Sequence, residues 1–369
     1  FARYRAVTQI YLRPTGFVES PQRHDGESLR LAGTMLWFSQ IEYIERAATF
    51  THRRLIAVHE WTDFTATLCD AHRERCALLL AHITSPRAAL HMGARTVRFD
   101  QPHVMGIINV TPDSFSDGGK NFEPEVAVEA AFAMSFAGAA IIDVGGESTR
   151  PGAALVWERD ELARVEPVIR RLAGAGIAIS IDTRKALVME GAVQAGAFMI
   201  NDISALLYDD RALDVARGSD VPIVMMHAPS QSSDPHKDGI YKDVVYDVFD
   251  WLEQRITAVE AVGISRDKIL VDPGIGFGKS LAENLAIINN LSMYHGLGCA
   301  ILFGASRKRL IGALSNEADA GSRLGGSIFL AMKAVEQGAQ IVRVHDVAET
   351  VQAIQVWRGL RDAGLTATI

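Results

Sequence analysis

Cysteine is scarce in this chain, and long apolar runs are missing. The 369 residues include three cysteines, Cys69, Cys76 and Cys299. An odd set of cysteines scattered along a long chain argues against a disulfide scaffold and is typical of a reducing compartment, so we expect a cytoplasmic protein. No stretch approaches the roughly 18 apolar residues of a membrane-spanning helix, and the opening FARYRAVTQIYLRPTGF lacks the apolar core of a signal peptide. We therefore expect neither a membrane span nor export.

The sequence also lacks an excess of positive charge. Its formal net charge is -7, which argues against non-specific binding to nucleic acid or to an anionic membrane, because both favour a basic surface. Hydrophobic residues make up 48% of the chain and charged residues 22%, which is the composition of a globular protein. We therefore expect small-molecule partners.

The charge of the chain changes near residue 98. Residues 1–98 contain 13 Arg, no Lys and 9 Asp or Glu, a net charge of +4, so residues 99–369 carry -11. This change predicts a boundary between a region 1–98 and a region 99–369. In the first region we expect a small α/β extension with strands at residues 10–14 and 55–60 and helices at residues 35–47 and 64–83. Its role stays open between a packing extension of the barrel, a dimerisation element and a separate binding module.

Residues 99–369 repeat one pattern eight times: an apolar, β-rich run, a turn, and a stretch of helical period. The runs begin at Val104, Ala140, Ala178, Met199, Val221, Lys268, Ala300 and Ile341. Continuous apolar runs are buried on both faces, as in a parallel sheet covered by helices. Helical stretches follow at residues 126–139, 160–176, 185–197, 244–263, 281–291, 325–339 and 347–364. The repeats predict a closed (β/α)₈ TIM barrel rather than an open sheet.

Polar side chains stand at the ends of these runs, where the loops of such a barrel meet over one mouth. They are Asn109, Asp143, Asp182, Asn201 with Asp202, His227, Asp272, Ser306 to Lys308, and Arg343 with His345. Taken singly, an Asp or Asn in this position is more often the N-cap of the next helix. Capping does not explain carboxylates and carboxamides inside runs such as MINDI, so the set as a whole predicts a site.

Seven blocks of sequence give this region a specific resemblance. MGIINVTPDSFSDGG from Met105 and GGESTRPGA from Gly145 resemble the two long signatures of dihydropteroate synthases. The shorter blocks IDT, IND, DPGIGFGK, ASRK and RVHDV then arrive in the order of that family. The resemblance covers the chain from about residue 95 to its end and implies a transferase of folate biosynthesis. Such an enzyme joins p-aminobenzoate to 6-hydroxymethyl-7,8-dihydropterin diphosphate and releases diphosphate.

The resemblance implies three neighbouring subsites. The pterin would bind Asp182, Asn201, Met226, Asp272, Phe277 and Lys308, whose donors and acceptors match the polar edge of the ring. The diphosphate would bind Asn109, Arg150, Arg343 and His345, with Mg²⁺ held by Asn109 and phosphate oxygens. The p-aminobenzoate would bind Phe115, Thr149, Pro151 and Lys308. The catalytic residues implied are Asp182, Asp272, Lys308 and Asp117, because fixed carboxylates near the ring stabilise the cation left when diphosphate departs.

Some features depart from the family or suggest other sites. Arg309 stands where many members have Ser, and the segment APSQSSDPHKDG after His227 replaces a stretch with Gly and Met. GIGFGKS is not a P-loop, because Pro273 occupies the position of its first glycine. CDAHRERC places Cys69, His72 and Cys76 on adjacent helical turns, which is more typical of an ordinary helix face than of a metal site.

Two alternative functions stay open at this point. A pterin-binding methyltransferase would share the residues at the pterin edge but would need no diphosphate clamp. An inactive homologue would keep the fold as a binding module. The family also implies a homodimer formed through barrel helices near the C-terminus.

Overall fold

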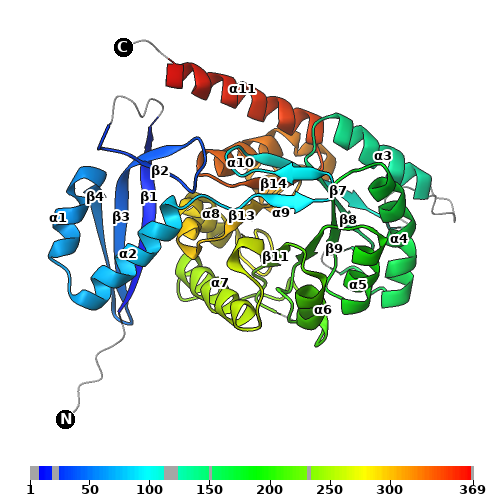
Figure 1. The fold of residues 1–369 in the computed structure, drawn as a ribbon, viewed down its shortest axis with the longest axis horizontal. Coiled ribbons are helices and arrows are strands. Elements are labelled where there is room, and N and C mark those ends of the chain that lie inside the picture. The colour runs from blue at the N-terminus through cyan, green and yellow to red at the C-terminus, as the bar shows by residue number, and fades with distance from the viewer. Residues whose placement is uncertain (1–7, 19–24, 112–123, 149–151, 231–233, 367–369) are drawn as a thin grey trace.

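Eight parallel strands close into a barrel in the second part of the chain (Figure 1). The computed structural model describes residues 8–18, 25–111, 124–148, 152–230 and 234–366. The barrel strands are β7 (His103–Asn109), β8 (Ile141–Gly145), β9 (Ile179–Asp182), β10 (Met199–Asp202), β11 (Ile223–Met226), β12 (Ile269–Asp272), β13 (Ala300–Phe303) and β14 (Ile341–Val344). Each strand pairs in parallel with its sequence neighbours, and β14 pairs with β7 to close the ring. All eight predicted strands are confirmed.

Helices surround the barrel. They are α3 (Pro124–Phe136), α4 (Glu158–Gly174), α5 (Ala186–Ala195), α6 (Ala212–Ser219), α7 (Val244–Ala261), α8 (Leu281–Asn289), α9 (Arg309–Leu314), α10 (Leu324–Glu336) and α11 (Val347–Thr366). The predicted helices are present, and local sequence explains their ends. A capping box at Ser280 and Glu283 begins α8, and Gly196, with φ +114°, ends α5. The short helices α6 and α9 were not predicted.

The lower part of the barrel interior is apolar. The inward-facing residues Met105, Ile141, Met199, Val224, Leu270, Leu302 and Ile341 form one buried cluster. A hairpin of β5 (Leu90–Met92) and β6 (Arg95–Val97) closes this end, because its buried side chains belong to the same cluster. One or two inward positions further along, six of the strands carry a polar side chain, so the upper end carries the chemistry. These side chains are Asn109, Asp143, Asp182, Asn201, Asp272 and Arg343.

The N-terminal extension is a four-stranded antiparallel sheet with two helices, which agrees with the predicted α/β class but corrects one element. Its strands are β1 (Gln9–Val18), β2 (Leu29–Arg30), β3 (Trp37–Ala47) and β4 (Phe50–Ala57), and its helices are α1 (Trp61–Ala66) and α2 (Asp70–Thr84). The helix predicted at residues 35–47 is wrong. This segment is the central strand β3, paired with β1 on one side and with β2 and β4 on the other. Strand pairing with β1, β2 and β4 determines the conformation of this segment and outweighs its helical pattern, because strand preference depends on the neighbouring strands.

Other elements of the extension differ in their limits. The helix predicted at residues 64–83 is two helices, separated at residues 67–69. The strand predicted at residues 55–60 ends at Ala57 and continues as a 3₁₀ turn, Val58–Glu60. A domain boundary at 98/99 stays a prediction, and the hairpin β5–β6 on its N-terminal side packs into the barrel.

Opposite charges join the extension to the outside of the barrel. Arg75 of α2 contacts Glu253 of α7 at 2.7 Å, and Arg46 contacts Asp247 at 3.3 Å. The Tyr11 hydroxyl donates to Asp250 at 2.8 Å. Beneath these contacts, β1 and α2 pack on the 3₁₀ helix η4 (Leu291–Leu297). The extension is basic and the barrel acidic, so the charge change in the sequence corresponds to a complementary interface.

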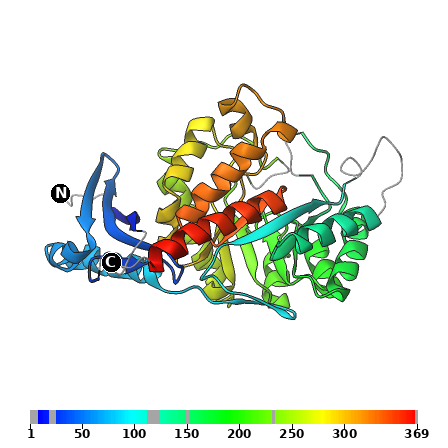
Figure 2. The same cartoon turned by 90° about the horizontal axis from the view of Figure 1, so that it is seen from above.

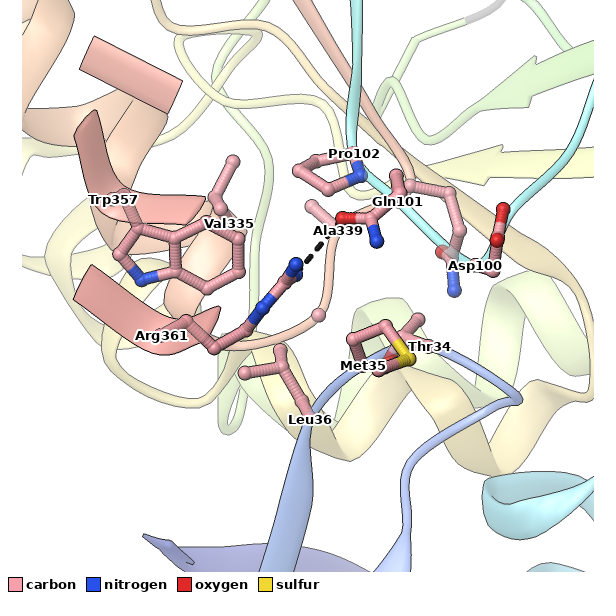
Figure 3. Close-up of a pocket in the computed structure, with 12 residues that line it drawn as sticks. Thr34, Met35, Leu36, Asp100, Gln101, Pro102, Val335, Ala339, Trp357 and Arg361 are labelled. Atoms are coloured by element: carbon pink, nitrogen blue, oxygen red, sulfur yellow. Dashed lines mark hydrogen bonds between the residues drawn. The ribbon is translucent and has the colours of Figure 1, made fainter. Parts of the chain in front are cut away.

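The C-terminal helix α11 reaches the junction between the two parts (Figures 1 and 2). There the buried Arg361 donates to Gln101 Oε1 at 2.8 Å, and its guanidinium lies 5.1 Å from the ring centre of Trp357 (Figure 3). Thr34, Met35 and Leu36 of the extension complete the lining. The cavity between them holds about 10 Å³, which is room for about one water molecule, so it is no substrate site.

No helix in the described part of the chain combines the length and the apolar character that a membrane crossing needs.

Candidate active site

The closed barrel brings the predicted pterin residues to one end. Strand register places Asn201 beside Asp182 and Met226 beside Asp272. The ring closure brings Arg343 of β14 across to the same carboxylates. At Gly304, an added Cβ would lie 3.8 Å from Arg343 Cβ and 3.9 Å from Asp272 Oδ2. The structure therefore gathers these side chains around one space at the carboxyl ends of the strands.

Arg343 forms the centre of a buried hydrogen-bond network. Its Nε donates to Asp143 Oδ2 at 2.5 Å, and its Nη2 donates to Asp182 Oδ2 at 2.5 Å. Asn201 Nδ2 donates to the same Asp143 oxygen at 3.0 Å. Burial alone would lower the pKa of Arg343, but Asp143 and Asp182 outweigh burial and raise it. Arg343 therefore stays a cation between two carboxylates.

The pKa of the Asp182 carboxyl group is raised as well, but for a different reason. Burial raises the pKa of Asp182 to about 7, although Arg343 opposes the rise. A buried carboxyl group that has a raised pKa and is paired with an arginine can accept hydrogen bonds from a ligand. It costs less to desolvate than an isolated anion. Asp182 is thus suited to bind the donor edge of a heterocycle.

Asp272 and Lys308 interact with each other and with Arg343 in the same space. Asp272 Oδ1 accepts the Gly274 N–H at 2.7 Å, and Lys308 Nζ donates to the carbonyl oxygen of Ile275. Burial lowers the pKa of Lys308 to about 8 against the effect of Asp272, and burial raises the pKa of Asp272 against the effect of Lys308. Each group therefore supports the charge of the other.

The predicted apolar residues of the pterin pocket also come together. Met226 and Phe277 form a small buried cluster with Ile203 and Ala228, separate from the main core. Lys308 Nζ lies 4.6 Å from the centre of the Phe277 ring. A flat apolar patch beside a hydrogen-bonding rim is the arrangement that a planar heterocycle needs.

The predicted anion residues lie at the neighbouring strand ends. Asn109 ends β7 and pairs in register with Gly145, which in turn pairs with Asp182. His345 follows Arg343 by two residues, and its Nδ1 lies 3.1 Å from Ser306 Oγ. Arg150, Thr149 and Pro151 lie outside the described residues, as do Phe115 and Asp117, so their roles stay predictions.

Asp143 is a site residue to which the sequence pattern assigned no role. Its side chain is fully buried and joins Arg343 to Asn201 through one oxygen. Its position inside the second apolar run was visible in the sequence, and the structure places it in the middle of β8, but its contacts depend on the closure of the ring. Asp202, by contrast, accepts the N–H groups of Ser204 at 2.7 Å and Leu206 at 2.8 Å, so it stabilises its own loop.

Lys279 organises the glycine-rich loop after β12 and was also missed. Its Nζ donates to the carbonyl oxygens of Gly274 at 2.8 Å, Phe277 at 3.2 Å and His227 at 3.3 Å. Burial lowers the pKa of Lys279 to about 7, against the effect of Asp272. The signal was a lysine that ends a loop with three glycines. This lysine holds Phe277 in place rather than binding phosphate.

A second missed group joins the two ends of the segment 147–156. Lys185 Nζ donates to Glu161 at 2.6 Å and to the Val156 carbonyl oxygen at 2.7 Å, and lies 3.0 Å from Glu147. Glu147 Oε1 accepts the Val156 N–H at 2.9 Å. All three charged side chains are buried. The group fixes both ends of the segment that carries the second family signature.

The donor chemistry of the site fits Mg²⁺ together with a phosphate ligand, but not a metal held by protein alone. Among the described residues, no three His, Cys, Asp or Glu side chains lie close enough to bind a metal ion. The carboxamide oxygen of Asn109 is a hard ligand of the kind that Mg²⁺ combines with phosphate and water oxygens. Cys69, His72 and Cys76 form no such group, and His72 Nδ1 lies 3.4 Å from the Tyr43 hydroxyl.

Comparisons with known proteins agree with this geometry. The profile of a family described as pterin-binding enzymes matches residues 105–345. The dihydropteroate synthase of Escherichia coli K12 is 45% identical over 256 residues, which cover 69% of this chain and 90% of that protein. A probable bifunctional folylpolyglutamate synthase/dihydropteroate synthase of Haloferax volcanii is 44% identical over 264 residues, 71% of this chain, but this chain spans 31% of its length.

Solved structures extend the likeness to three dimensions. A Xanthomonas albilineans dihydropteroate synthase with 4-aminobenzoic acid has a TM-score of 0.71 and 44% identity, and the match covers 74% of this chain and 98% of that one. The same enzyme with 7,8-dihydropteroate has a TM-score of 0.68 and 42% identity, with 74% and 99% covered. The sequence profile, the sequence relatives and the barrel agree: the chain belongs to the pterin-binding enzyme family and, within it, to the dihydropteroate synthases.

Proposed function

We propose that the chain condenses p-aminobenzoate with 6-hydroxymethyl-7,8-dihydropterin diphosphate to give 7,8-dihydropteroate and diphosphate. One observation carries this proposal. Arg343 stands at the meeting point of two subsites, bonded to Asp143 and Asp182 on the pterin side and two residues before His345 on the anion side. A single strand end thus connects the group that binds the ring with the group that binds its leaving anion.

The pterin would lie against Met226 and Phe277, with its polar edge toward Asp182, Asn201 and Asp272. Burial of these side chains makes their hydrogen bonds selective, because an analogue that left them unpaired would bind poorly. Lys308, held as a cation beside Asp272, would donate to the carbonyl side of the ring. The site would therefore recognise the ring before any chemistry begins.

Carbon–oxygen cleavage at the exocyclic methylene is the central step. The bond to diphosphate breaks, the amine nitrogen of p-aminobenzoate bonds to the methylene carbon, and the amine loses one proton. The fixed carboxylates of Asp182 and Asp272 would stabilise the positive charge that spreads into the ring as diphosphate leaves. Arg343 and His345, with Arg150, would bind the departing anion through charge-assisted hydrogen bonds.

Asn109 would hold Mg²⁺, which supplies additional charge neutralisation to the diphosphate when bound. The p-aminobenzoate amine is neutral near pH 7, so it needs position and exclusion of water more than a strong base. Phe115, Asp117, Thr149 and Pro151 would provide this position, with Lys308 near the benzoate. Arg309 begins α9 directly after Lys308, so the contact with the benzoate carboxylate would differ from that in members with Ser there.

Product analysis tests the proposed function. Purified protein is incubated with both substrates and Mg²⁺, and mass spectrometry measures 7,8-dihydropteroate while a coupled assay measures diphosphate. We expect equal amounts of the two products. Release of diphosphate without dihydropteroate, or binding of the pterin diphosphate that inorganic diphosphate fails to weaken, would favour another class of pterin-binding barrel.

A homodimer and a cytoplasmic location are further parts of this proposal. Leu314, Leu324 and Phe329 on α9 and α10, and Val356 and Leu360 on α11, are exposed apolar side chains on the C-terminal helices. Such a surface on a monomer favours association with a second copy. Analytical ultracentrifugation should give twice the chain mass. The three free thiols suit a reducing compartment, which cell fractionation would test.

A further inference from the structure

The loop after β11, which departs from the family pattern, packs against the glycine-rich loop after β12. The Gly239 N–H donates to the Gly278 carbonyl oxygen at 2.9 Å. At Gly278, whose φ is +54°, an added Cβ would lie 2.2 Å from Pro229 Cγ and 2.4 Å from the Lys237 carbonyl oxygen. The two loops therefore pack backbone to backbone, and Gly278 permits this approach because it has no side chain.

His236 makes the aromatic contact between these loops. Its ring lies parallel to that of Phe277, with 4.7 Å between the ring centroids and 12° between the planes. Its Nδ1 lies 3.3 Å from the Gly276 carbonyl oxygen. The His236 N–H donates to Asp234 Oδ1 at 2.9 Å, which fixes the local turn. The imidazole thus rests on the residue that supplies the aromatic part of the proposed pterin pocket.

Phe277 is contacted from several directions. Lys279 holds its carbonyl oxygen, Lys308 Nζ lies 4.6 Å from its ring centre, and Met226 packs in the same apolar cluster. Of these groups, Lys308 and Met226 would themselves touch the pterin. His236 lies in the loop after β11 and is not among the residues predicted to touch the pterin. It would hold the Phe277 ring from outside the pterin pocket. A ring stacked in this manner restricts the rotation of its neighbour about χ1 and χ2.

We propose that His236 is a positioning residue for the pterin subsite. Its ring holds Phe277 in the orientation in which Phe277 and Met226, packed in one apolar cluster, together offer an apolar face to the flat heterocycle. This inference rests on the proposed function, because that function assigns Phe277 to the pterin. It also gives a role to His236 within the segment after His227, where the sequence departs from the Gly and Met-bearing pattern of the family.

Three variants of the full-length chain test this role. His236→Ala removes the ring, His236→Phe keeps a ring that can stack, and Lys237→Ala changes an exposed side chain of the same loop. Steady-state kinetics give KM and kcat for each substrate, and calorimetry with 6-hydroxymethylpterin, which lacks diphosphate, gives the affinity for the ring. Thermal unfolding of each variant separates binding from stability.

We expect His236→Ala to raise KM for the pterin diphosphate and Kd for 6-hydroxymethylpterin about three- to tenfold, the size of one aromatic contact. KM for p-aminobenzoate should change less than twofold. His236→Phe should restore most of the affinity, and Lys237→Ala should match the wild type. An unchanged pterin Kd in His236→Ala, or no recovery in His236→Phe, would overturn the inference.

Calorimetry also separates this inference from the proposed function. A wild-type chain that binds 6-hydroxymethylpterin but forms no dihydropteroate refutes the proposed function, while the His236 variants still decide the inference. A wild-type chain that does not bind the pterin overturns both.

Discussion

At the residue scale, the chemistry depends on a small number of charged groups that share one buried space. Arg343 contacts two carboxylates directly, and one of them, Asp143, also accepts from Asn201. Removing one member of such a network leaves the others with unsatisfied charge or hydrogen bonds. Single substitutions should therefore have effects larger than the loss of one ordinary hydrogen bond.

Asp143→Asn should weaken pterin binding without direct contact to the ligand. The variant loses the charge that holds Arg343 Nε, so Arg343 is left to pair with Asp182 and competes with the pterin for that carboxylate. A charge-assisted hydrogen bond contributes about 1.5–3 kcal/mol, so calorimetry should show at least a tenfold loss of pterin affinity. Ser180→Ala is the control, because Ser180 is buried on β9 beside Asp143 in register. Equal affinities in both variants would refute the role.

Lys308 should set the alkaline limit of activity. Burial lowers the pKa of Lys308 to about 8, so the ammonium is present below this pH and is lost as the pH rises through it. Since the proposed role needs the cation, kcat/KM for the pterin diphosphate should fall as the pH rises through about 8. In Lys308→Arg, whose guanidinium stays protonated, the decline should move upward in pH. A decline at the same pH in both proteins would assign it to another group.

At the element scale, the strand pattern determined how much the sequence could predict. The barrel strands are buried on both faces and lie at regular intervals, so their positions followed from the apolar runs alone. Residues 35–47 were misassigned because Phe38, Ile41 and Ile44 also fall at helical spacing. Pairing with β1 and β4 decided the outcome. The contact between Asp143 and Arg343 could not be predicted, because it joins residues of β8 and β14 that ring closure brings together.

The buried ion pairs of Lys185 with Glu147 and Glu161, which join the two ends of the segment 147–156, should be important for stability. Lys185→Met leaves the buried Glu161 without its cation, while Glu147 keeps Arg184 at 3.6 Å. Breaking a buried pair costs about 3–5 kcal/mol. Chemical denaturation should show this loss in the free energy of unfolding. Lys268→Met, which breaks a solvent-exposed pair with Asp220, should cost at most about 1 kcal/mol. Similar losses in the two variants would contradict this assignment.

At the scale of the whole molecule, the extension and the barrel fold against each other through apolar and charged contacts. Tyr11 packs on Tyr246 and Phe249 of α7 with ring centroids 4.7 and 5.4 Å apart. The sheet and helices of the extension contact the barrel at α7, at η4 and next to Asp100, whereas the site lies at the carboxyl ends of the strands. The extension should therefore act through stability rather than through catalysis.

A chain shortened to residues 88–369 tests this. It keeps the hairpin β5–β6 that closes the barrel and exposes the surface of η4 and α7. We expect a melting temperature several degrees lower and a greater tendency to aggregate, with KM for both substrates within twofold of the full chain in the fraction that stays folded. A large rise in either KM with an unchanged melting temperature would instead connect the extension to the site.

The dependence of the reaction rate on each substrate, in the wild type and in Asp182→Asn, is the most direct measurement. The central claim is that a hydrogen-bonding pterin subsite and a cationic diphosphate subsite share one end of the barrel. We expect diphosphate release that requires both substrates, and in Asp182→Asn a rise in KM for the pterin diphosphate of tenfold or more, as the loss of a charge-assisted acceptor predicts. Release that needs one substrate alone, or an unchanged KM in Asp182→Asn, would contradict the claim.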